Sequence, residues 1–235
     1  MKVQVRYRDA RGAERTQPAD VLRGVPVEEH PALSVPRAFR GRRSILTHWW
    51  SATTGQRVVC STEAHMHAAM LLDFDPSVVF FGAPCLEVCW ERGPQSGAVR
   101  PAFLARTAHG ARLALLHPRA AGARGGHEEE AMAAAASGAG WTLRPLPSTT
   151  GVLKASLLRA ASYRNPGFAD PDVRPRLLDA FTRPRPLASG AAAVGGLAAL
   201  SCAWHLLWTG ELTWDHRLPL TPASPVWTPS KDHLA

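Results

Sequence analysis

The stretch from residue 48 to residue 90 constrains the fold of this chain most. Apolar residues recur at helical spacing over 61–74, which predicts an amphipathic helix with one buried face. An acidic corner then precedes Pro76 and ends the helix, because the residue before a proline disfavours the helical conformation. Strands are predicted to begin near Val78 and Leu86. A helix followed by two strands is common to many α/β folds, so the pattern indicates a fold class and not a function.

The rest of the first 148 residues completes an α/β unit. Alternating apolar residues predict a hairpin at the N-terminus, and a proline-rich connector follows it. The further predicted elements are strands over 103–106, 112–116 and 141–146 and a helix over 128–136. We therefore divide this part of the chain into an N-terminal hairpin with its connector, residues 1–39, and a core, residues 40–148.

Beyond residue 148 the pattern changes to helical segments joined by proline-rich turns. Helices are predicted over 152–163, 174–181 and 187–208, so residues 149–218 are expected to form a small helical domain. Residues 219–235 contain four prolines and are expected to form an extended tail. The apolar run before residue 208 is interrupted by Ser201, His205 and three glycines, which argues against a membrane span.

The cysteines indicate the compartment. Cys60, Cys85, Cys89 and Cys202 show neither a CxxC pair nor the Cys and His spacing of structural zinc sites. No charged and then apolar leader opens the sequence. We therefore expect free thiols and a cytoplasmic protein.

The net charge of +8 suits a polyanionic partner. Only three of the 27 basic residues are lysines, however, and alanine, glycine and proline are abundant, so a genomic composition bias explains part of the arginine content. The charge is uneven along the chain: the net values are +6 for residues 1–60, −2 for 61–140, +5 for 141–190 and −1 for 191–235. The two positive segments flank the core, as expected if a surface that contacts phosphates surrounds a site.

Several short motifs, taken together in their order and spacing, resemble the TnsA-like endonuclease subunit of heteromeric transposases. The matching stretches are Trp49-Trp50-Ser-Ala-Thr-Thr-Gly55, Leu71-Leu-Asp-Phe-Asp-Pro76, Pro84 with Leu86 and Trp90, Arg100-Pro101-Ala-Phe-Leu-Ala-Arg106, Gly140-Trp141, Tyr163-Arg164-Asn-Pro166 and His205-Leu-Leu-Trp208-Thr-Gly-Glu-Leu212. The resemblance spans roughly residues 40–226. It implies a restriction-endonuclease-like core, a mixed sheet flanked by helices, followed by the helical C-terminal domain. It also implies DNA and a separate strand-transfer transposase subunit as partners.

The resemblance further implies where a catalytic centre should lie. Such cores hold Mg²⁺ with a Glu on the first helix, an Asp after a Pro on one strand, and a Glu or Gln on the next strand, followed one residue later by Lys. In this chain those positions map to His65, Ala102, Leu115 and His117, so the expected acidic ligands are missing. We therefore expect an impaired nuclease that acts as a DNA- or transposase-binding scaffold without a bound metal.

Two alternatives stay open at this point. An active endonuclease that cuts transposon ends with its partner would need substitute carboxylates and Mg²⁺. The two histidines could instead bind a softer ion such as Zn²⁺, with His67 or His109 as a third ligand.

DNA binding is predicted independently of catalysis, because phosphate contacts require cationic side chains and no metal ligands. Arginines concentrate in the loop over 37–43, which either grips phosphates or is a solvated basic loop, and again in the helical domain. The residues expected to contact DNA are Arg40, Arg42, Arg43, Arg159, Arg164, Arg174 and Arg176.

Overall fold

The computed structural model describes residues 1–33, 46–117 and 126–229 and divides the chain into two compact units, Met1–Pro147 and Ser148–Ala235. Within the described residues there are six α-helices and several sheets, so the expected α/β class is confirmed. The boundary between the units lies one residue from the boundary expected between the core and the helical domain. The loop with Arg40, Arg42 and Arg43 lies outside the described residues.

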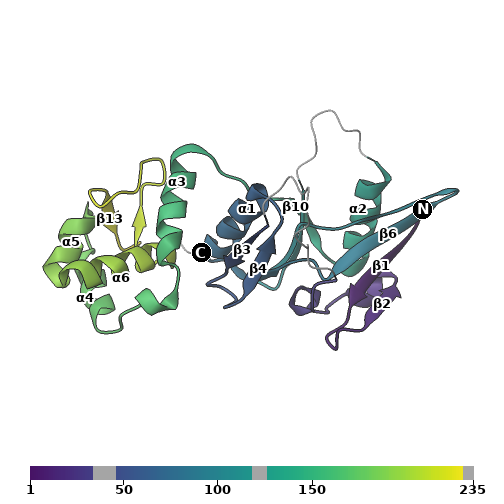
Figure 1. Cartoon of the computed structure of the whole chain (residues 1–235), viewed down its shortest axis with the longest axis horizontal. Coiled ribbons are helices and arrows are strands. Elements are labelled where there is room, and N and C mark those ends of the chain that lie inside the picture. The colour runs from purple at the N-terminus through teal and green to yellow at the C-terminus, as the bar shows by residue number, and fades with distance from the viewer. Residues whose placement is uncertain (34–45, 118–125, 230–235) are drawn as a thin grey trace. The chain divides into compact units, whose positions relative to one another are not determined.

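The first unit contains two four-stranded sheets (Figure 1). One has the order β2-β1-β6-β7 and is antiparallel throughout. The other has the order β10-β9-β8-β5 and is mixed, because β10 runs parallel to β9 while the other pairs are antiparallel. The strands are β1 (Lys2–Arg8), β2 (Glu14–Gln17), β5 (Val78–Gly82), β6 (Leu86–Arg92), β7 (Gln95–Val99), β8 (Phe103–Thr107), β9 (Arg112–Leu116) and β10 (Thr142–Pro145).

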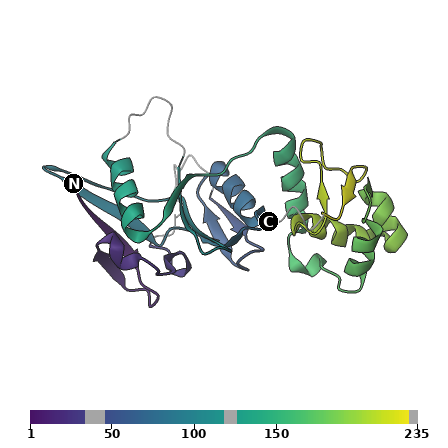
Figure 2. The same ribbon diagram turned by 180° about the vertical axis from the view of Figure 1, so that it is seen from behind.

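Two helices cover these sheets. Helix α1 (Glu63–Phe74) packs against β5 and against a hairpin of β3 (Thr47–Trp50) and β4 (Arg57–Cys60), and both views show this hairpin beside α1 (Figures 1 and 2). Helix α2 (His127–Ala139) lies on β1, β6, β7 and β10 and buries an alanine-rich face. Gly140 ends α2 in the left-handed conformation with φ +74°, which glycine adopts without strain. Short 3₁₀ turns at Ala19–Leu22 (η1) and Val27–Glu29 (η2) follow the first hairpin.

The second unit is mainly helical. Its α-helices are α3 (Gly151–Ala160), α4 (Val173–Ala180), α5 (Leu187–Val194) and α6 (Gly196–Trp208). Two 3₁₀ turns, Ala161–Tyr163 (η3) and Pro166–Phe168 (η4), connect α3 to α4. The helix predicted over 187–208 is therefore two helices, which meet at Gly195.

The C-terminal segment differs from the extended tail expected from its prolines. Strand β13 (Pro225–Trp227) is the central strand of an antiparallel sheet with β11 (Arg185–Pro186) and β12 (Thr213–Trp214). Leu220 and Val226 are 2 % and 0 % exposed. Burial of these apolar side chains in the core of the unit removes them from water and stabilises the segment against the helices. The segment up to residue 229 is therefore part of the domain.

The four cysteines are free thiols, as expected. Burial raises the pKa of Cys60 to about 11 and that of Cys85 to about 12, so both thiols stay protonated at neutral pH. None of the helices in the described ranges is both long enough and apolar enough to cross a membrane.

Candidate functional site

Helix α1 presents His65 to the interior of the first unit. Thr62 is the N-cap, and its side chain accepts a hydrogen bond from the backbone N–H of His65 at 3.1 Å. His65 shares the buried face of the helix with Ala68, Ala69 and Leu72, in accordance with helical spacing. The side chain lies in the first turn and the residue is only 7 % exposed.

Strands β8 and β9 bring the second histidine to the same place. Phe103 and Leu115 are directly opposite in this antiparallel pair, so their side chains share one face of the sheet. His117 follows two residues after Leu115, at the end of β9, and continues that face. The ring of His65 lies over this face, with its centroid 5.5 Å from that of Phe103 and 4.6 Å from that of His117.

The two imidazoles are in direct contact. Nε2 of His65 lies 3.1 Å from Nδ1 of His117, and Oγ of Ser61 lies 2.9 Å from Nδ1 of His65. Because a hydrogen bond needs one proton between the two nitrogens, one ring donates and the other accepts. Ser61, His65 and His117 therefore form a short hydrogen-bonded chain between the start of α1 and the end of β9.

Both rings are neutral at pH 7. Desolvation by burial lowers the pKa of His65 to about 4, and repulsion from His117 adds to this effect. Desolvation also lowers the pKa of His117. The pair consequently carries no charge at neutral pH, unlike a cluster of carboxylates.

All four positions to which the resemblance assigns the catalytic centre adjoin one another. The backbone N–H of Ala102 donates to the carbonyl of Leu115 at 2.6 Å, and both residues are buried. His117 and His65 complete the group through the contacts described above. An alanine, a leucine and two histidines supply no carboxylate oxygen at this location.

The buried acidic residue on α1 has a structural role. Asp73 is 7 % exposed, and four donors bind its carboxylate at 2.8–3.0 Å: the indole N–H of Trp49, the hydroxyl of Ser51 and the backbone N–H groups of Ala52 and Thr53. These bonds occupy both oxygens, so the carboxylate holds the turn of the β3–β4 hairpin against the end of α1. The motifs around Trp49 and Leu71 therefore both hold the β3–β4 hairpin against α1.

Two other carboxylates are also engaged. Glu87 on β6 is 5 % exposed and forms ion pairs with Arg6 and with Arg100, the latter at 2.8 Å. Glu63 points to solvent with a side chain 74 % exposed and lies 3.6 Å from His67. Within the described residues no three His, Cys, Asp or Glu side chains gather where they could hold a metal, so neither His67 nor His109 joins the imidazole pair.

The arginines expected to contact DNA in the second unit all make contacts within the protein. Arg159 donates to the carbonyl of Leu220 at 2.9 Å, and Arg164 donates to that of Ala161 at 2.7 Å. Arg176 donates to the carbonyl of Val194 at 2.5 Å. Arg174 forms an ion pair with Glu211.

A guanidinium has five N–H donors, which is more than the contacts named for Arg159, Arg174 and Arg176 use. Arg159, Arg174 and Arg176 are exposed, and Arg164 is half-buried.

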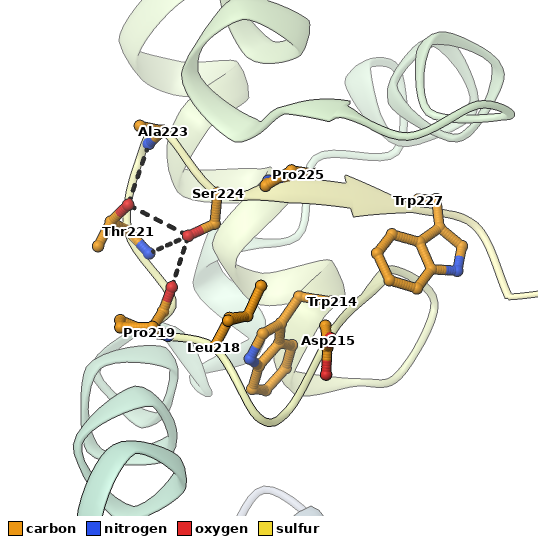
Figure 3. A pocket seen from close by; sticks show the side chains of 9 residues that line it. All are labelled: Trp214, Asp215, Leu218, Pro219, Thr221, Ala223, Ser224, Pro225 and Trp227. Atoms are coloured by element: carbon orange, nitrogen blue, oxygen red, sulfur yellow. Dashed lines mark hydrogen bonds between the residues drawn. The ribbon is translucent and has the colours of Figure 1, made fainter.

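A separate pocket of about 480 Å³ lies in the second unit (Figure 3). The nine lining residues are Trp214, Asp215, Leu218, Pro219, Thr221, Ala223, Ser224, Pro225 and Trp227. The Ser224 hydroxyl donates to the carbonyl of Pro219 at 2.7 Å and accepts from the N–H of Thr221 at 2.8 Å. None of the nine is basic, so the pocket is not suited to phosphate.

Comparison with protein-family models and with curated proteins finds no match for this chain. Sequence reasoning named both histidines and missed their direct contact and the role of Ser61. It also missed the Asp73 cluster, for which the closely spaced hydroxyl and glycine residues after Trp50 were the available signal.

Proposed function

We propose that the chain is a TnsA-like subunit of a heteromeric transposase whose nuclease centre has lost its metal ligands, and that it acts as a DNA- or transposase-binding scaffold. In this proposal α1 and the mixed sheet belong to a restriction-endonuclease-like core. The observation that carries it is the contact of His65 with His117 and of Ala102 with Leu115, at the four positions that the resemblance assigns to the catalytic centre. Their spatial grouping is what a former catalytic centre requires.

The side chains at these positions are unsuited to phosphodiester hydrolysis. Such hydrolysis generally uses carboxylates that hold Mg²⁺, which activates water and neutralises developing charge. Neutral imidazoles are poor ligands for this hard ion, and Ala102 and Leu115 offer no side-chain ligand at all. Asp73 and Glu87 cannot replace them without giving up the hydrogen bonds and ion pairs that keep them buried.

Binding to DNA remains possible without catalysis. The positive net charge lies in two segments that flank the core, and exposed arginines such as Arg176, Arg183 and Arg185 are available on the second unit. A cytoplasmic location and a separate strand-transfer subunit belong to the same proposal. The scaffold would hold DNA or its partner while that subunit performs the chemistry.

The test is a paired binding and cleavage assay on the purified full chain. With supercoiled plasmid and Mg²⁺ or Mn²⁺ we expect no nicking, by the chain alone or together with a strand-transfer transposase subunit, and salt-sensitive binding to duplex DNA. Metal-dependent nicking that Glu87→Gln or His117→Ala abolishes would overturn the proposal of a lost nuclease centre. The absence of any binding to DNA or to the transposase would overturn the scaffold role.

A further inference from the structure

The imidazole pair has the geometry of a two-point chelate. Nε2 of His65 and Nδ1 of His117 are 3.1 Å apart. An ion about 2.1 Å from each nitrogen, the usual length of a Zn–N bond, would make an N–metal–N angle of about 95°. Adjacent ligands in tetrahedral and octahedral complexes subtend angles near this value, so a single ion can reach both nitrogens once the rings turn away from the line of their hydrogen bond.

Ser61 provides the support that a metal-bound histidine generally requires. Its Oγ lies 2.9 Å from Nδ1 of His65, where it can accept the Nδ1–H of the ring. With the proton on Nδ1, Nε2 of His65 accepts the Nδ1–H of His117 in the metal-free chain. When His117 carries its proton on Nε2 instead, the lone pairs of both facing nitrogens are available to one metal ion. Metal-bound histidines commonly donate their second N–H in this way, which fixes both tautomer and ring orientation.

Both rings are also held in place. His65 lies in the first turn of α1 and packs against Phe103, whereas His117 directly follows β9. His117 is the more exposed of the two and provides the approach from solvent.

The donor set selects the kind of ion. Nitrogen ligands favour Zn²⁺, Ni²⁺ and Cu²⁺, whereas Mg²⁺ and Ca²⁺ prefer oxygen. Solvent would complete the coordination, since the described part of the chain gathers no third His, Cys, Asp or Glu around an ion. The internal segments 34–45 and 118–125 contain none of these residue types either.

We propose that His65 and His117 form a solvent-accessible binding site for a nitrogen-preferring transition-metal ion, with Ser61 orienting His65. This site is independent of the proposed scaffold function, because it needs only the two imidazoles and their contact. An ion bound there would keep coordination positions open to solvent. It would lie where the resemblance leads one to expect the missing carboxylates.

The experiment is a calorimetric titration of the chelator-stripped full chain with Zn²⁺, Ni²⁺ and Mg²⁺. We expect saturable binding of a single Zn²⁺ or Ni²⁺ ion and no heat with Mg²⁺. His65→Ala and His117→Ala should each abolish this binding. The matched controls are His48→Ala and His109→Ala, which remove exposed histidines from the same unit and should leave it unchanged.

A second measurement uses the wild-type chain alone, so it remains valid if the His65→Ala variant does not fold. In the nitrogen-15 NMR spectrum of the folded wild-type chain, the ring signals of His65 and His117 should shift together on addition of Zn²⁺. Zn²⁺ binding that persists in a folded His117→Ala variant would overturn the proposal, as would a wild-type chain that binds no more Zn²⁺ than this variant. Neither result would affect the DNA-binding assay, so the two proposals fail separately.

Discussion

The indole N–H of Trp49 donates a 3.0 Å hydrogen bond to Oδ2 of Asp73, which joins strand β3 to the last turn of α1. The hydroxyl of Ser51 and two backbone N–H groups converge on the same carboxylate. One buried side chain therefore determines how the hairpin sits on the helix that carries His65. The packing of this hairpin and the geometry of the candidate site are linked through α1.

Replacing Asp73 with Asn should destabilise the first unit by about 2–4 kcal/mol. The amide group has nearly the same shape but places an NH₂ where an acceptor is needed, so at least one buried donor loses its partner. The measurement is the free energy of unfolding from urea titration of the full chain. Asp75→Asn is the matched control, because Asp75 is in the same acidic corner and accepts one exposed hydrogen bond from Ser77. Equal effects of the two substitutions would contradict the structural role of Asp73.

The histidine pair should make the metal-free protein sensitive to mild acid. His65 has a pKa of about 4 in the folded chain, below the ordinary value of 6.5. Between these values the unfolded chain binds more protons than the folded one, so stability falls as the pH falls from about 6.5 towards 4. Across that interval this residue alone accounts for roughly 3 kcal/mol. The lowered pKa of His117 acts in the same direction.

The measurement is urea unfolding at pH 7 and pH 4.5 in the presence of a chelator. His65→Phe removes the titrating group while retaining a buried ring, and it should reduce the difference in stability between the two pH values. His48→Ala, which changes an exposed histidine, should leave the difference as in the wild type. If the His65→Phe variant loses as much stability as the wild type on acidification, the lowered pKa of His65 is not the cause of the acid sensitivity.

Gly190 in α5 permits close contact with a buried ring. A Cβ atom at this position would lie 2.2 Å from Cζ of Phe181, which is 0 % exposed and cannot move aside without opening the core. Gly190→Ala should therefore destabilise the protein by about 1–3 kcal/mol through overpacking, although alanine is the better helix former. The measurement is the free energy of unfolding of the full chain. Ser189→Ala, one residue earlier and exposed, is the control and should have little effect; a stabilising Gly190→Ala would contradict the tight packing.

Local patterns predicted much of the architecture. Helix α1 was predicted from the spacing of its apolar residues, and the structure places it at Glu63–Phe74 with Thr62 as its N-cap. Strands β8 and β9 were predicted in sequence and pair as neighbours. Strand β7 was missed because Gln95–Val99 has little apolar alternation. It forms because β6 pairs with it and because Gly97 leaves room for Trp90, where a Cβ would lie 2.7 Å from the ring.

The remaining features depended on tertiary structure. The run over 187–208 has helical composition throughout, and the backbone conformations of Gly195 and of Gly196, which has φ +67°, separate α5 from α6. The contact between His65 and His117 joins residues 52 positions apart. It depends on how α1 lies over the mixed sheet, which no local pattern specifies. Both residues were named through the resemblance, whereas their hydrogen bond could be found only from the fold.

The last prediction concerns the arginines of the second unit as phosphate contacts. Arg183 and Arg185 are exposed and lie in the segment with a net charge of +5, so their removal should weaken binding to duplex DNA without altering the core. Each phosphate contact releases counterions and contributes about −0.9 to the slope of log affinity against log salt concentration. The double variant Arg183→Ala with Arg185→Ala should therefore flatten that slope by up to about 1.8.

The measurement is fluorescence anisotropy of a labelled duplex over a range of salt concentrations. The control is Arg92→Ala with Arg217→Ala, which removes the same charge from exposed positions outside the two positive segments and so separates a local contact from an effect of net charge. If the two double variants flatten the slope equally, Arg183 and Arg185 make no specific phosphate contact. If the wild-type chain shows no salt-dependent binding, its arginine content reflects composition and not a DNA-binding surface.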